Sequence, residues 1–353
     1  DPIDEENEAV SEALAAARVH RRKGRAREMA SIYDKVLSID PNNLEALQGM
    51  AEITTMMKNP QAALPIYAKI LHQYPENLEA LNNRGIILMQ MGDAEASEFS
   101  FRKALRVAPD DLDSLNNLGF NLIEQKRFDE AKHELIRACN IAPEGTSHYY
   151  NLALLYMRSE PKETKTPLKY LRQALRINPH FTDAHINASN LYSFENDLDT
   201  ALDHINKALL ARPDDPIILF NKGVLLRRQK KFSEALNCLT AAKPDFPEPH
   251  KLNHEIGTTH YEAGDLKNAT AFFVTAISSR VNYKQGYLSL GKALAETGQL
   301  TKAKEAFRQA GNGIEVKQRL NTLNILTGEE DPWPLLREAF DIGKLNIAST
   351  EFA

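Results

Sequence analysis

The sequence predicts an all-α protein, a right-handed α-solenoid of about nine helix-turn-helix repeats that ends in a capping helix. Three observations predict this fold. Prolines recur at a period of 34 residues, small residues recur at fixed places within that period, and apolar residues follow the spacing of one helix face. One such unit is too small to bury its own apolar face, so neighbouring units must stack to close a continuous core.

The prolines separate consecutive units. They lie 34 residues apart, with one step of 36, and the segments around them are similar, as in SIDPNNLEAL and RVAPDDLDSL. A proline stops one helix, and the Asp, Asn or Thr that follows can cap the next. The series is Pro41, Pro75, Pro109, Pro143, Pro179, Pro213 and Pro247.

Each unit is expected to hold one helix at positions 1 to 14 and a second at about 17 to 29. In residues 112–145 the first helix has an apolar stripe at i, i+3, i+4 and i+7, and the second helix supplies a facing stripe. The first stripe is Leu115, Leu118, Gly119 and Leu122, and the second is Phe128, Ala131, Leu135 and Ala138. Small residues at position 8 would let the two backbones approach: Gly85, Gly119, Ala153, Ser189, Gly223, Gly257 and Gly291.

This pattern resembles the tetratricopeptide repeat (TPR) family, which has a small residue eighth, Ala at positions 20 and 27, a large apolar residue at position 24 and Pro at position 32. The resemblance covers about residues 10 to 313. It departs from the pattern at Met29, Pro167 and Val281, and the fifth unit has two extra residues in its turn. The expected domain, residues 1–313, divides into units 10–43, 44–77, 78–111, 112–145, 146–181, 182–215, 216–249, 250–283 and 284–313.

The end of the chain leaves the period. Residues 314–328 are expected to form the solvating, capping helix, and residues 329–353 a tail with a short helix after Pro334. The amphipathic piece WPLLREAF (333–340) is expected to pack on the last repeat. The alternative is that it enters the groove of its own or a neighbouring molecule, so homo-oligomerisation through the tail or the terminal repeats stays open.

An asparagine recurs at position 6 of the first helix in five consecutive units, on the face opposite the packing stripe. Asparagine is mildly unfavourable within a helix, and its carbonyl and NH₂ can grip one backbone amide bidentately. The row would therefore hold an extended peptide along its main chain. Its alternative role is structural, through hydrogen bonds to the adjacent repeat or its own backbone. The row is Asn83, Asn117, Asn151, Asn187 and Asn221.

The row is similar to the asparagine ladder in the TPR superhelix of O-linked N-acetylglucosamine transferase, and this resemblance implies that the five residues clamp a threaded peptide. Neighbouring inner positions add amide and apolar surface suited to the side chains of such a ligand. These further candidate residues are Asn82, Asn116, Phe120, Tyr150 and Asn190.

Composition and motifs exclude several other functions. A net charge of −5 and a pI near 6.1 give no global attraction for nucleic acid or anionic membrane. The basic clusters 18–27 and 227–231 are interpreted as solvated helix ends, and His250 and His254, at i, i+4, lack a third metal ligand. No phosphate-binding loop, nucleophile elbow or zinc motif is present, so neither catalysis nor a cofactor is expected.

The sequence favours a scaffold that binds an extended or helical segment of a partner protein in its concave groove. Two alternatives stay open: a substrate-recognition arm of a larger enzyme such as a glycosyltransferase, or an assembly factor of a bacterial envelope, pilus or secretion system. The first residue is not Met, so we expect a processed product or a piece of a longer protein. A soluble protein is expected, in the cytoplasm or, alternatively, the periplasm, because no apolar run is long enough for a signal peptide or a membrane span.

Overall fold

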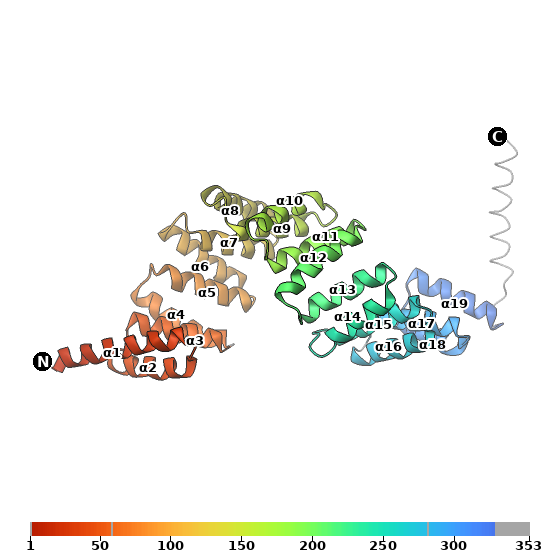
Figure 1. Cartoon of the computed structure of the whole chain (residues 1–353), viewed down its shortest axis with the longest axis horizontal. Helices are drawn as coiled ribbons and strands as arrows, with labels where there is room; N and C mark the ends of the chain where they lie inside the picture. The colour runs from red at the N-terminus through yellow and green to blue at the C-terminus, as the bar shows by residue number, and fades with distance from the viewer. Residues whose placement is uncertain (1, 58, 281, 329–353) are drawn as a thin grey trace. The chain divides into compact units, whose positions relative to one another are not determined.

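The computed structural model describes residues 2–57, 59–280 and 282–328, and the regular secondary structure of these residues is entirely α-helical. The predicted all-α class is confirmed. Nineteen helices follow one another in this part of the chain (Figure 1). They are α1 (Pro2–Arg22), α2 (Ala26–Ile39), α3 (Leu44–Met56), α4 (Pro60–Gln73), α5 (Leu78–Gln90), α6 (Ala94–Val107), α7 (Leu112–Glu124), α8 (Phe128–Ile141), α9 (Thr146–Ser159), α10 (Lys165–Ile177), α11 (Thr182–Phe194), α12 (Leu198–Ala211), α13 (Pro216–Arg228), α14 (Phe232–Ala242), α15 (Pro249–Glu262), α16 (Leu266–Ser279), α17 (Lys284–Glu296), α18 (Leu300–Ala310) and α19 (Ile314–Leu326).

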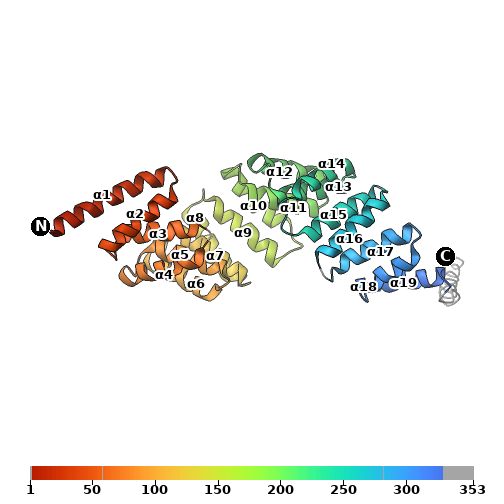
Figure 2. The ribbon, with the colours of Figure 1, turned by 90° about the horizontal axis from the view of Figure 1, so that it is seen from below.

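The helices group into two compact units, Asp1–Ala184 and His185–Ala353. Within a unit, a first helix packs on the second helix of its own repeat, and that second helix packs on the next first helix. The series α5, α6, α7 shows this order in the first unit, and α15, α16, α17 shows it in the second (Figures 1 and 2). The predicted helix-turn-helix array is therefore present in both units, while its division at the numbered unit boundaries stays a prediction.

The first helices form the inner layer of each unit. In the first unit α5 approaches α7 and α7 approaches α9, and in the second unit α13 approaches α15 and α15 approaches α17. Among the described residues, consecutive second helices do not approach one another to a comparable degree. The array within each unit therefore curves toward its first helices, and residues on their free face line the inside of that curve.

Capping side chains and left-handed turn residues set the helix boundaries. Asn43, Asn77, Asp111 and Asp215, which follow the prolines, each accept a backbone N–H from the first turn of the next helix, as predicted. Inside the repeats, the turn residue at position 15 has positive φ at every described position except Glu160, where φ is −133°. It is glycine in four repeats, but Lys126, Asn196 and Lys230 also adopt φ of 61–64°. The position-15 residues with positive φ are Gly24, Gly92, Lys126, Asn196, Lys230, Gly264 and Gly298.

The core of a repeat forms where the small residue at position 8 meets the large residue at position 24. A Cβ atom added to Gly85 would lie 2.5 Å from Cε1 of Phe101, and one added to Gly119 would lie 2.6 Å from Cδ2 of Leu135. Gly223, Gly257 and Gly291 face Leu239, Phe273 and Phe307 in the same way. Because the large side chain at position 24 packs directly on the backbone at position 8, the spacing of the two helices is fixed, and the inner face of the first helix keeps one orientation from repeat to repeat.

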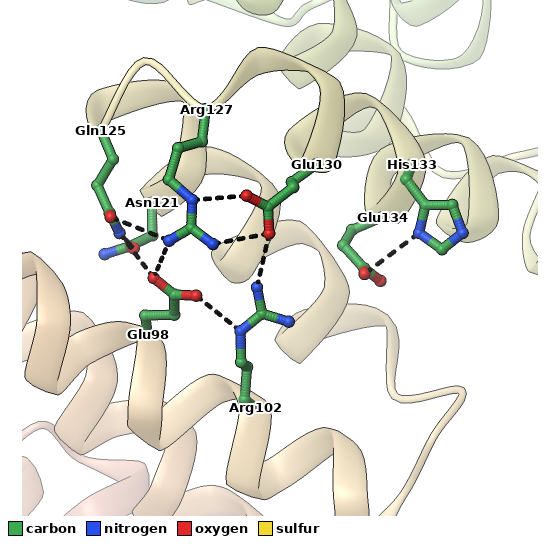
Figure 3. A network of polar contacts seen from close by, with 8 residues as sticks. All are labelled: Glu98, Arg102, Asn121, Gln125, Arg127, Glu130, His133 and Glu134. Carbon is green, nitrogen blue, oxygen red and sulfur yellow. Dashed lines mark hydrogen bonds and ion pairs between the residues drawn. The ribbon is translucent and has the colours of Figure 1, made fainter.

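A polar network ties α6 to the turn between α7 and α8 (Figure 3). Glu98, only 14% exposed, accepts hydrogen bonds from Arg102 at 2.7 Å, Arg127 at 2.6 Å and Gln125 at 3.1 Å. Burial alone would raise the pKa of Glu98, but these hydrogen bonds lower it below the ordinary value. Glu130 joins the two arginines from the other side at 2.7 and 3.2 Å. The network therefore fixes one repeat on the next.

The predicted C-terminal capping helix is α19, which packs on α18. Val316 and Leu323 of α19 are buried against the last repeat, and the amine of Lys304 in α18 hydrogen-bonds Thr327 just beyond α19. The expected tail helix after Pro334 falls in residues 329–353, outside the described residues.

Candidate functional site

The asparagine row falls on the first helices of both units. Asn83, Asn117 and Asn151 lie on α5, α7 and α9 of the first unit, while Asn187 and Asn221 lie on α11 and α13 of the second. All five side chains are half-buried. Because α5, α7 and α9 are consecutive members of the inner layer, the first three asparagines occupy the same place on adjacent helices.

The three asparagines of the first unit differ in their partners. Asn83 is hydrogen-bonded to the hydroxyl of Tyr67, whose pKa is raised by burial. The side chains of Asn117 and Asn151 form no hydrogen bond with the described residues. An amide that is half-buried yet unpaired can bind a main-chain N–H and C=O without losing a contact inside the protein.

The predicted neighbours at position 5 serve a structural role. Asn82 donates to Asp111 at 3.1 Å and accepts from the hydroxyl of Ser114 at 2.9 Å. The oxygen of Asn116 lies 2.8 Å from Nδ1 of His148, and its NH₂ donates to a backbone carbonyl within α7. Both pairs join position 5 of one repeat to position 3 of the next, so these two amides hold neighbouring repeats together, and their predicted contact with a ligand stays a prediction.

The remaining predicted site residues are partly available. Phe120 is half-buried beside Asn117 on α7, and Asn190 on α11 is exposed. The ring of Tyr150 packs against Phe181, with 4.8 Å between their centroids. Phe120 therefore contributes apolar surface next to the unpaired amides, whereas Tyr150 is partly used in packing.

A cavity of about 370 Å³ opens on the inner layer of the first unit, between α3 and α5. The free faces of the two helices line it, Tyr67 of α4 lies behind them, and Arg21 contributes from α1. Asn83 is one of its lining residues, so the asparagine row continues directly into this cavity. The lining also includes Glu52, Met56, Glu79 and Ile86.

A second cavity, of about 240 Å³, occupies the same place in the repeat in the second unit, between α15 and α17 with Phe273 of α16 behind. His254, Ser289 and Lys292 are among its lining residues, and Nε2 of His254 lies 2.9 Å from the hydroxyl of Ser289. Sequence reasoning missed both cavities, because their volume depends on how far adjacent first helices separate.

The histidines considered as metal ligands have other partners. The buried His250 lies 2.9 Å from the guanidinium of Arg280, and His254 packs between Phe273 and Tyr283. Within residues 2–57, 59–280 and 282–328, no cluster of three His, Cys, Asp or Glu side chains is arranged to hold a metal ion.

Two histidines of the second unit, His204 and His254, are expected to make the stability of the protein depend on pH. Burial, with smaller effects of His185 on His204 and of Arg227 on His254, lowers both pKa values from 6.5 to about 4. The unfolded chain binds protons below pH 6.5 that the folded chain does not, so stability present above pH 6.5 is lost as the pH falls toward 4. We expect a loss of about 1–2 kcal/mol per histidine between neutral pH and pH 5.

Urea unfolding, followed by circular dichroism at both pH values, measures this loss. The variant carrying His204→Gln and His254→Gln should show a flatter pH dependence. His133→Gln is the control, because that side chain is 75% exposed. A double variant with the wild-type pH dependence would show that other groups cause the loss.

The two basic clusters behave differently. In α1, Arg18 and Arg21 are exposed and pair with Glu45 at 2.6 Å and Glu52 at 2.7 Å of the next first helix. Arg227, at the end of α13, is only 17% exposed and pairs with Glu255 at 2.5 Å. A solvated helix end was therefore the wrong expectation for Arg227, whose partner lies 28 residues further along the chain.

Family models described as tetratricopeptide repeat match residues 78–111, 112–142, 186–248 and 285–310. The type IV pilus assembly protein PilF of Pseudomonas aeruginosa is 28% identical over 148 residues, which are 41% of this chain and 57% of that protein. The human protein O-mannosyl-transferase TMTC3 is 26% identical over 152 residues, which are 39% of this chain and 17% of that protein. The chain thus matches only part of the length of either relative.

Several solved structures share the fold. The Cut9–Hcn1 hetero-tetramer of the APC/C gives a TM-score of 0.59 at 14% identity, covering 84% of this chain and 59% of that chain. The structure of the type IV pilus biogenesis factor PilW gives a TM-score of 0.54 at 21% identity, covering 60% of this chain and 97% of that chain. A tetratricopeptide repeat protein from Parabacteroides merdae gives a TM-score of 0.52 at 20% identity, covering 70% of this chain and 98% of that chain. At these identities the likeness shows the fold alone.

Among the described residues, no helix has the length and apolar character needed to cross a bilayer. The helix pairs, the position-8 packing and the matched family models agree on one class of protein-interaction scaffold. The chain contains tetratricopeptide repeats and has the fold of tetratricopeptide repeat proteins.

Proposed function

We propose that the inner layer of the first unit binds an extended segment of a partner protein by its main chain. The observation that carries this proposal is the pair Asn117 and Asn151, two unpaired, half-buried amides at the same position of adjacent first helices. Phe120 and Leu154, both half-buried, lie three residues further along the same helices and add apolar surface for ligand side chains.

Main-chain recognition follows from the chemistry of the amide. One asparagine can donate to a peptide C=O and accept from a peptide N–H, and two successive asparagines fix the direction of an extended chain. Such contacts do not depend on ligand sequence, so selectivity must come from the neighbouring side-chain pockets. This division of roles explains why the row repeats while its neighbours vary.

The test uses random dodecapeptides displayed on phage and selected against the full chain, with affinities of synthetic peptides measured by fluorescence anisotropy. The double variant Asn117→Ala, Asn151→Ala should bind the selected peptides at least about fivefold more weakly, since each net hydrogen bond contributes about 1 kcal/mol. Its helix content should be retained, because alanine is the better helix former.

Asn140→Ala is the matched control, because Asn140 is exposed on the second helix α8. Its affinity should equal that of the wild type. Undiminished binding by the folded double variant would contradict main-chain recognition by the row.

A second candidate function is assembly of a bacterial pilus or envelope structure, which the partial match to the pilus assembly protein PilF favours. Binding a subunit through an extended segment is compatible with the groove proposed above. The alternative of a recognition arm in a larger transferase has the partial match to TMTC3 in its favour. Identification of the natural protein that competes with the selected peptides decides between the two.

A further inference from the structure

The two inner-layer cavities occupy the same place in the repeat but differ in chemistry. In the first, the lining includes the carboxylates Glu52 and Glu79 and the apolar side chains Met56 and Ile86. In the second, the corresponding positions are Thr258, Gln285, Glu262 and Lys292, in the same order. The fold therefore builds one kind of pocket twice, and the residues that line it determine what each can hold.

Among the described residues, one carboxylate of the first cavity, Glu79, forms no ion pair. Glu52 is paired with Arg21 at 2.7 Å, but Glu79 is contacted only by the amide of Gln48, at 2.8 Å, and forms no ion pair with the described residues. Glu79 is exposed, so its carboxylate is open to a ligand.

The cavity wall about two helical turns from Glu79 is apolar and adaptable. Met56 is 61% exposed although it lines a cavity, and the unbranched thioether of methionine can follow the shape of different side chains. Ile86, from the next first helix, is half-buried and packs on the core. This end of the cavity can therefore hold an apolar side chain of the same ligand.

The charged residues Glu262 and Lys292 of the second cavity already form ion pairs within the protein. Glu262 pairs with Arg227 at 2.5 Å, and Lys292 pairs with Glu315 at 2.7 Å. Gln285 replaces Glu79 there. This cavity therefore lacks the unpaired carboxylate and serves as an internal comparison for the first.

We infer that the cavity between α3 and α5 binds a lysine or arginine side chain of the extended peptide, with its cation at Glu79. This inference rests on the proposed function, since Asn83 connects the cavity to the asparagine row that would hold the main chain. The cavity then supplies side-chain selectivity that the row itself lacks. The partner segment carries a basic residue at a fixed place relative to the main-chain clamp.

The test uses the dodecapeptides selected on the full wild-type chain. We expect them to carry lysine or arginine at one conserved place, and replacing that residue by methionine should weaken binding about five- to tenfold at low salt. On the Glu79→Gln chain the same peptide change should matter less than about twofold, because the charge it addresses is gone.

Glu76→Gln is the matched control. It removes the same charge three residues away, at an exposed position outside the cavity, and should leave the preference for a basic peptide intact. Because both glutamates are exposed and the replacement is nearly isosteric, neither variant should change the helix content measured by circular dichroism.

The outcomes separate the two proposals. Peptides that depend on Asn117 and Asn151 but show no basic preference, or a preference unchanged by Glu79→Gln, would overturn this inference and leave the proposed function standing. Peptide binding that depends on neither the asparagines nor Glu79 would overturn both.

Discussion

Replacing Phe101 by alanine is expected to lower the free energy of unfolding by about 3–5 kcal/mol, the usual cost of removing a buried aromatic ring. Phe101 is fully buried, belongs to the core cluster with Leu118 and Leu122, and lies against the backbone of Gly85. The loss is expected to reach beyond one repeat, because an array is held together by contacts between neighbouring units.

A matched control lies on the same helix. Phe99 is 56% exposed, so Phe99→Ala should change stability by less than about 0.5 kcal/mol. Urea unfolding followed by circular dichroism measures both variants, and hydrogen exchange of α5 to α7 localises the effect. Equal losses at Phe99 and Phe101 would show that the ring is not a core anchor.

Gly85 gives a sharper test of the same contact. Gly85→Ala alone should destabilise by about 1–3 kcal/mol, since overpacking forces the ring to shift. Its new Cβ would lie 2.5 Å from Cε1 of Phe101. In the Phe101→Ala background the clash is absent and alanine is the better helix former, so the same change should stabilise. A sign reversal in this double-mutant cycle would demonstrate direct contact, and additive effects would exclude it.

The sequence predicted contacts within one repeat well, because they depend only on helix geometry. The position-8 glycines face position 24 as the period implied, and Asn43, Asn77, Asp111 and Asp215 cap the helices after the prolines. The caps involve residues that are close in the chain, and the position-8 contacts follow from the angle of 100° between successive helical residues. They could therefore be read from spacing alone.

Contacts between repeats could not be predicted in the same way. Asn82 and Asn83 are adjacent, yet Asn82 bonds the following repeat at Ser114 and Asn83 bonds Tyr67 of the preceding one. The angle and distance between neighbouring repeats decide which residue reaches which partner. A weak signal was present in the 32-residue spacing of the pairs Asn82–Ser114 and Asn116–His148, but it acquires meaning only once the stacking is known.

Arg227→Ala is the second large expected effect, a loss of about 2–4 kcal/mol, somewhat below the range for a fully buried ion pair because one partner is partly exposed. Arg227 is 17% exposed and lies between Glu255, 14% exposed, and Glu262, 37% exposed, at 2.5 Å from each. Removing the guanidinium would leave the Glu255 carboxylate without its counter-charge in a site largely closed to water.

Glu255 lies at position 6, where the five preceding repeats have asparagine. A second substitution, at Glu255, can therefore separate the effect of the unpaired charge from the effect of lost packing. If the unpaired carboxylate causes the loss, Glu255→Asn in the Arg227→Ala background should recover most of it, because a neutral amide tolerates this environment. Lys207→Ala is the control, since its pair with Asp203 is exposed and should contribute less than about 0.5 kcal/mol. Urea unfolding of the four chains gives the comparison. If the double variant does not recover the lost stability, the loss comes instead from the packing of the aliphatic stem of Arg227. In that case the need to neutralise Arg227 would not explain why the asparagine row ends at Glu255.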